Sequence, residues 1–230
     1  MLMSTTKAKT SSGPATSSTP SAAAVPFELT ATNGSSVPGF QYFSVFPPAL
    51  KNPPPKSQVL TALVSDATDQ AGTTTLTWNG GSGALALFAL LEGTSPNNAH
   101  RTPVALGDTV AVALVDGAFT LTATAGGPAN AIEVTFAPGV PPGGQIGLVV
   151  GPAPILVAIP AGLSSLTLEP DLSPTVTVVF GTAFQFPEAN ESDVSQSATT
   201  TFKQDATTEA SPTAIAHIEV DLDNKITQVG

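Results

Sequence analysis

Four titratable residues near the C-terminus have the types and the spacing that could bind a metal ion. His217, Glu219, Asp221 and Asp223 alternate with apolar residues along the segment 215–223. If this segment is a β-strand, all four side chains share one face, because successive residues of a strand point to opposite sides. Grouped carboxylates could bind Ca²⁺, and a histidine with carboxylates could bind a transition metal. The alternative is a solvated outer face, or charges that block pairing at a sheet edge.

Three further residues are candidates for ligand binding. His100 and Arg101 are adjacent in the polar segment 96–102, where they could form an anion-binding or acid–base pair. Trp78 precedes an Asn-Gly-Gly turn signal and could present an aromatic platform to a sugar. The alternatives are an exposed loop that happens to carry His100 and Arg101, and a Trp78 that packs in the core. No residue of the chain is predicted to be catalytic.

The sequence lacks the motifs of the commoner kinds of catalysis. It has no cysteine, which excludes disulfides, thiol nucleophiles and cysteine-ligated metals. The serine of Gly80-Gly-Ser-Gly83 lies in a glycine turn and not in a Gly-x-Ser-x-Gly nucleophile elbow. Glycine-rich phosphate loops need a helix behind them, and none is expected here. We therefore expect a protein that is not an enzyme and uses no cofactor.

The elements that position these residues are predicted to be strands. From Pro26 onward, short runs rich in Val, Thr, Leu and Phe are separated by Gly, Pro, Asn and Asp, which is typical of many short strands. Asp116-Gly117 predicts a type I′ hairpin, and Asp223-Asn224 gives a weaker signal of the same kind. Ala84–Leu91 contains helix-forming residues, but the glycines on both sides favour a buried strand. The predicted fold is all-β, an antiparallel β-sandwich of jelly-roll or immunoglobulin-like type, with a barrel-like arrangement as the alternative.

The chain is expected to divide into an N-terminal arm and one sandwich domain. Residues 1–25 are rich in Ser, Thr, Ala and Pro and have too little apolar content to fold alone, which predicts a flexible arm. Residues 26–230 are expected to form the sandwich. The Pro/Gly-rich stretch 137–144 is either an internal break or a long connection between sheets. No signal peptide is recognised, so the compartment stays open between intracellular and non-classically exported.

The surface of this protein must be poor in charge. Charged residues make up 10% of the chain, against about 25% in ordinary globular proteins. The net charge of −10 and the single arginine argue against nucleic-acid binding, which needs basic side chains. No apolar run reaches the roughly 20 residues of a transmembrane helix. A surface with few ionised groups costs little to desolvate and lacks charge repulsion, so copies of the same chain are the expected partner.

Three short motifs occur in a characteristic order along the chain. They are Phe43-Ser-Val-Phe-Pro-Pro48, Gly144-Gln-Ile-Gly147 and Val178-Val-Phe-Gly181. This order resembles a group of microbial and fungal β-sandwich proteins with no established activity. The resemblance covers most of Phe27–Val229 and implies a sandwich fold, and it carries over no functional residue.

These observations predict a non-enzymatic structural protein that self-associates into an oligomer, shell, filament or crystalline assembly. The arm would then lie on a neighbouring copy as an exchanged tail. One alternative is a binding module for a glycan or an apolar small molecule. A second alternative is an atypical enzyme that uses an apolar pocket.

Overall fold

The computed structural model describes residues 25–36, 41–55, 57–59, 63–80, 85–96, 99–151, 153–159, 161–181, 197–204 and 213–229 of the chain. The expected N-terminal arm lies outside these residues except for Val25, where the first strand begins. The described segments are nearly all β-structure, which confirms the predicted all-β fold. Ala84–Leu91, where helix and strand competed, contains a strand with three buried residues.

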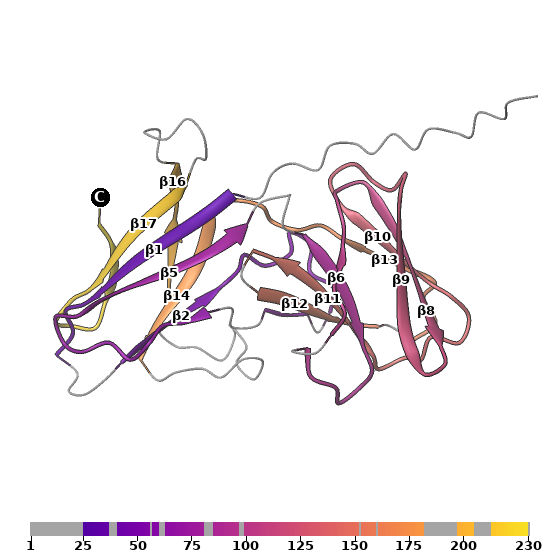
Figure 1. Ribbon diagram of the computed structural model, residues 1–230, viewed down its shortest axis with the longest axis horizontal. Coiled ribbons are helices and arrows are strands. Elements are labelled where there is room, and N and C mark those ends of the chain that lie inside the picture. The colour runs from indigo at the N-terminus through magenta and orange to yellow at the C-terminus, as the bar shows by residue number, and fades with distance from the viewer. Residues whose placement is uncertain are drawn as a thin grey trace, which may run out of the picture.

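The strands of the described residues form four sheets, which are arranged as two sandwiches side by side (Figure 1). The first sandwich combines the beginning and the end of the described chain. One of its sheets has the order β16-β17-β1-β5, with β18 attached to β17, and the other has the order β15-β14-β2-β4. Their bounds are β1 Val25–Asn33, β2 Tyr42–Phe46, β4 Leu63–Val64, β5 Thr73–Gly80, β14 Thr175–Gly181, β15 Ser197–Thr201, β16 Lys203–Gln204, β17 Ala214–Val220 and β18 Ile226–Gln228.

The second sandwich is built from the middle of the chain. Its sheets have the orders β13-β10-β8-β9 and β3-β12-β11-β6-β7. Their bounds are β3 Gln58–Val59, β6 Ala86–Leu90, β7 Thr102–Pro103, β8 Asp108–Val115, β9 Ala118–Ala125, β10 Ile132–Phe136, β11 Gln145–Val150, β12 Ala153–Ala158 and β13 Ser165–Leu168. The stretch 137–144 connects β10 to β11 and so leads from one of these sheets to the other.

Most neighbouring strands of the described residues are antiparallel, but two pairs among them are parallel. β1 runs parallel to β17, with Phe27 opposite Ala214, and β8 runs parallel to β10. The first of these pairs joins a segment near the start of the described chain to one near its end. The strands of the second sandwich come between these two segments in the sequence. Each of the four sheets keeps two outer strands, so no closed barrel forms within the described residues.

Each sandwich has its own core, and strand β2 contributes to both. Phe43 and Val45 point into the first core, whereas Phe46 points into the second. Val179 of β14 likewise joins the second core, although its neighbour Val178 belongs to the first. Because alternate residues of a strand face opposite sides, the part of this sheet that contains Phe46 and Val179 is buried on both faces, whereas Thr199 and Thr201 of its outer strand β15 are exposed. The two sandwiches are therefore packed together through this sheet.

Candidate functional site

Trp78 lies near the end of β5 in a cluster of three aromatic rings. Its ring stacks on Phe27 with the centroids 5.6 Å apart and the planes 8° from parallel. It also meets the ring of Phe202 edge-on, at 5.3 Å and 88°. Trp78 is half-buried and packs against the first core. A sugar-binding platform needs an open ring face, and Phe27 covers one face of this ring.

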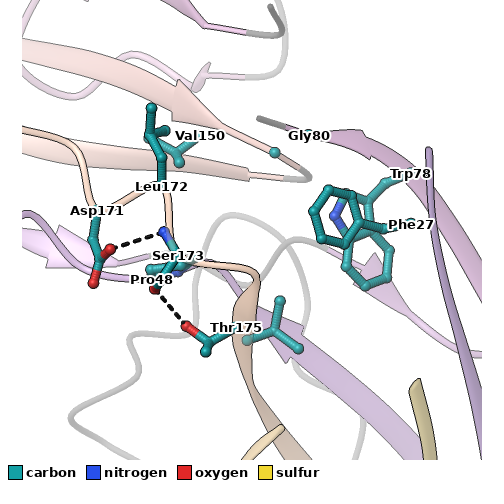
Figure 2. A pocket seen from close by; sticks show the side chains of 11 residues that line it. Phe27, Pro48, Trp78, Gly80, Val150, Asp171, Leu172, Ser173 and Thr175 are labelled. Atoms are coloured by element: carbon teal, nitrogen blue, oxygen red, sulfur yellow. Dashed lines mark hydrogen bonds between the residues drawn. The ribbon is translucent and has the colours of Figure 1, made fainter. Parts of the chain in front are cut away.

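A small cleft lies beside the aromatic cluster, between the two sandwiches. Figure 2 shows Trp78 and Phe27 on one side and Leu172 with Ser173 on the other. The cleft has a volume of about 30 Å³, whereas small-molecule sites typically enclose about 300–1,000 Å³. Asp171 accepts a hydrogen bond from the backbone N–H of Ser173 at 2.9 Å, so its carboxylate holds the local turn. The cleft has room for water but not for a sugar ring.

His100 lies at a larger groove in the second sandwich, of about 450 Å³. The walls of the groove are β6 with the segment that follows it and the first half of β9, and its lining includes Leu90, Leu91, Phe119 and Leu121. Arg101 is exposed and does not line the groove, although it follows His100 directly. The structure thus brings one of the two predicted residues to an apolar groove. Neither residue has a neighbouring carboxylate at salt-bridge distance within the described part of the chain.

The outward-facing backbone groups along the β9 wall of this groove have no backbone partner among the described residues. Val115 and Ala118 flank the two-residue hairpin and pair with each other, so alternate residues from Ala118 bond to β8. The backbone N–H and C=O groups of the intervening residues, Phe119 and Leu121, therefore point away from β8. β9 is the outermost strand of its sheet, and no backbone partner for these groups occurs among the described residues. The groove is bordered by a free strand edge.

The opposite wall of the groove is also an incompletely covered edge. β7 pairs only with Ala86 and Leu87 of β6, and the chain before Thr102 leaves the sheet. Val104 donates to the carbonyl of Leu85, which fixes the odd-numbered residues of β6 as those that face β7. By this alternation Ala89 directs its backbone groups into the groove, which it also lines.

The predicted metal-binding row is divided by the end of a strand. His217 and Glu219 are exposed on the outer face of β17, and Ile218 and Val220 are buried on the other face, as expected. β17 ends at Val220, so Asp221 and Asp223 belong to the turn before β18. Within the described ranges, no three His, Asp or Glu side chains are grouped so that they could hold a metal ion.

The carboxylate of Asp221 has a structural role in that turn. Its Oδ1 accepts hydrogen bonds from the backbone N–H groups of Asp223 at 3.0 Å and Lys225 at 2.9 Å. Asn224 adopts a positive φ of 63° between them, as a tight turn requires. The hairpin predicted from Asp223-Asn224 is therefore present, and it uses one of the carboxylates that the metal hypothesis needed.

The structure places two long strands at sheet edges, a position that the sequence did not predict for them. β5 and β9 each contain eight residues and are each the outermost strand of a sheet. Neither contains a charged residue or a proline. Their outward-facing positions are occupied by threonine, at 73, 75 and 77 in β5 and at 120, 122 and 124 in β9. The repeated Thr-x-Thr pattern was visible in the sequence, but it does not reveal which strands have a neighbour on both sides.

Among the described residues, no helix is long and apolar enough to cross a membrane.

Comparisons with known proteins do not identify a function for these surfaces. No protein-family model, curated protein or solved structure matches this chain.

Proposed function

We propose that this protein is a non-enzymatic structural protein that assembles with copies of itself through its uncharged edge strands. The observation that carries the proposal is the composition of β5 and β9, which are eight residues long and have neither charge nor proline. Edge strands of soluble proteins are usually short, charged, bulged or covered, because an open edge can pair with another chain. Strands without any of these features suit a protein whose edges are covered by another copy.

The faces beside these edges support the same proposal. On the outer face of the first sandwich, Thr73 and Thr75 of β5 lie opposite Thr32 and Thr30 of β1. Threonine side chains lose little hydration free energy on burial compared with ionised groups. The second sandwich also exposes apolar side chains, among them Val115 at 50% and Leu163 at 55% of their surface. Such surfaces can be covered by a second copy at low cost.

The packing of Trp78 gives little support to the alternative of a glycan-binding module. The ring is stacked on Phe27, and the adjoining cleft is too small for a sugar. The groove at His100 is large enough for a ligand, but its walls are strand edges, which favour an extended chain over a compact small molecule.

The proposal is tested by the mass of the full-length chain in solution. Light scattering after size-exclusion chromatography, over a concentration series up to the millimolar range, should show species larger than the 23.0 kDa chain. A chain that stays monomeric throughout the series would overturn the proposal.

Lysine substitutions identify the strands responsible. Thr75→Lys in β5 or Thr122→Lys in β9 should shift association to higher concentration, because like charges would approach each other at the paired edge. Thr167→Lys is the matched control, since Thr167 is also an exposed threonine of an outermost strand but lies on the short β13. Equal effects of all three variants would count against pairing at β5 and β9.

A further inference from the structure

We propose that residues 1–12 of a second copy occupy the groove between β6 and β9 as an added strand, paired with the free edge of β9. The inference rests on the proposed self-association and specifies what covers one of the two open edges. The groove offers backbone donors and acceptors on Phe119 and Leu121, with apolar side chains beside them. Recognition of an extended segment at a sheet edge uses such an arrangement, in which main-chain hydrogen bonds give affinity and adjacent pockets take alternate side chains.

The sequence of the N-terminal segment fits an added strand. Residues 1–12 form its longest stretch without Gly or Pro, whereas Gly13, Pro14 and Pro20 would interrupt a strand. In an extended chain, Thr6, Ala8 and Thr10 share one face, which is small and uncharged. That face can lie on the apolar floor of the groove without burying a charge.

The opposite face of the same stretch is basic, and the groove is flanked by acids. Lys7 and Lys9 are the only charged side chains among residues 1–24, so all 17 acidic residues lie in the remainder of the chain. Two of them adjoin the groove, since Glu92 follows the lining residue Leu91 and Asp116 precedes the lining residue Gly117. Both acids are exposed. A strand placed on β9 can therefore turn its lysines toward two unpaired carboxylates within the described structure.

The length of the segment permits this contact between copies. Twelve residues, 13–24, separate the proposed strand from Val25 at the start of β1. An extended chain spans about 3.4 Å per residue, so this connection reaches about 40 Å. It can therefore extend beyond its own sandwich to a neighbour that is packed against it.

Single cysteines introduced into the full-length chain test the contact directly, because the natural sequence has none. One batch carries Thr5→Cys, on the face of the added strand that points away from the floor of the groove, and a second, isotopically heavier batch carries Ala118→Cys at the exposed start of β9. The two batches are mixed and treated with a short bismaleimide. Mass spectrometry should find the cross-link between one light and one heavy chain. The matched control is Ala125→Cys, which is also exposed and lies at the far end of the same strand.

The outcomes separate this inference from the proposed function. A light–heavy cross-link about tenfold more abundant with Ala118→Cys than with Ala125→Cys supports it, since docking raises the local concentration at one site only. Equal yields from the two positions would overturn it. So would a cross-link that forms within single chains of the double variant Thr5→Cys/Ala118→Cys but not between chains. Associated material without any cross-link would overturn the inference alone, whereas a strictly monomeric chain would overturn the proposed function as well.

A double-mutant comparison tests the charges. Lys7→Gln with Lys9→Gln should lower the cross-link yield severalfold, and so should Glu92→Gln with Asp116→Asn in the other batch. If the lysines act through these carboxylates, the combination should lose no more than either pair alone, because both pairs remove the same interaction. Multiplying losses would contradict this placement of the lysines.

Discussion

Asn33 shows how one buried polar side chain fastens a loop to the first sandwich. Its side chain is fully buried at the end of β1. Its amide group donates to the backbone carbonyls of Thr68 and Asp69, both at 3.1 Å. Its Oδ1 accepts from the hydroxyl of Ser35 at 2.7 Å and from the N–H of the same residue at 3.2 Å. Every polar atom of the side chain is thus satisfied, which is what makes its complete burial tolerable.

Replacement of Asn33 by alanine should destabilise the protein by about 1–3 kcal/mol, because buried carbonyl groups would lose their donors. Urea unfolding, followed by the fluorescence of Trp78, measures the loss. Asn52→Ala is the control, since Asn52 is exposed and donates only to Glu169 at the surface. Indistinguishable midpoints for the two variants would contradict a structural role for Asn33.

Gly147 is required by the ring that lies over it. It pairs with Phe88 across β11 and β6, and a Cβ atom at this position would overlap the buried Phe88 ring. Gly147→Ala should therefore cost about 1–3 kcal/mol of stability, as other overpacked cores do. Thermal unfolding of the double variant Gly147→Ala/Phe88→Leu tests the cause. The smaller side chain should recover part of the loss, whereas simple addition of the two single losses would exclude the ring as its source.

The β8–β9 hairpin joins local sequence to the groove. Asp116 and Gly117 have φ values of 50° and 78°, the positive angles that the Asp-Gly pair predicted for a type I′ turn. A Cβ atom at Gly117 would meet no atom within 4 Å, so space is not what selects glycine here. The turn needs glycine for its backbone conformation, and it sets which residues of β9 face the free edge.

Two substitutions in this turn test whether its backbone conformation or its carboxylate contributes to the stability of the protein. Gly117→Ala should destabilise the protein by about 1 kcal/mol, the cost of a left-handed conformation for a residue with a side chain. Asp116→Asn should change the free energy of unfolding by less than about 0.5 kcal/mol, since Asn-Gly forms the same turn. Differential scanning calorimetry measures both. A loss of stability in Asp116→Asn would show that the carboxylate of Asp116 stabilises the folded chain itself and does not act only in binding another copy.

Local elements were predictable from the sequence because their signals are local. The Asp-Gly turn and the alternation of His217 and Glu219 with Ile218 and Val220 depend only on neighbouring residues. The division into two sandwiches was not predictable, since it depends on the parallel pairing of β1 with β17 across most of the chain. The groove at His100 could not be predicted either, because it exists only where β7 stops short beside β6 and β9.

The two sandwiches are joined by shared packing as well as by the chain. The polypeptide first reaches the second sandwich at β3 and goes back to the first for β4 and β5. It then forms β6 to β13 of the second sandwich before it returns to the first at β14. Phe43 and Phe46 of β2 are both fully buried, yet they lie in different cores. Loss of order in either sandwich would therefore expose one face of the sheet that contains β2. This arrangement favours unfolding of both sandwiches in one step.

The aromatic residues allow that step to be observed. Trp78 and Tyr42 are the only tryptophan and tyrosine of the chain, and both belong to the first sandwich. Intrinsic fluorescence thus reports on that sandwich and on its junction with the second, where Val150 and Gly151 line the same cleft as Trp78. Far-ultraviolet circular dichroism reports on the strands of both. We expect the two signals to change at the same denaturant concentration, as for a two-state transition.

Phe43→Ala and Phe46→Ala provide the decisive comparison, because the same truncation is made three residues apart on one strand. Each should lower the stability by about 3–5 kcal/mol, the usual cost of a phenylalanine removed from a core. If the sandwiches unfold together, both variants should shift the fluorescence and circular dichroism transitions equally. If they are independent, Phe43→Ala should shift the fluorescence transition and leave a second, unshifted circular dichroism transition. That second result would show that β2 and β14 connect the sandwiches without coupling their stability.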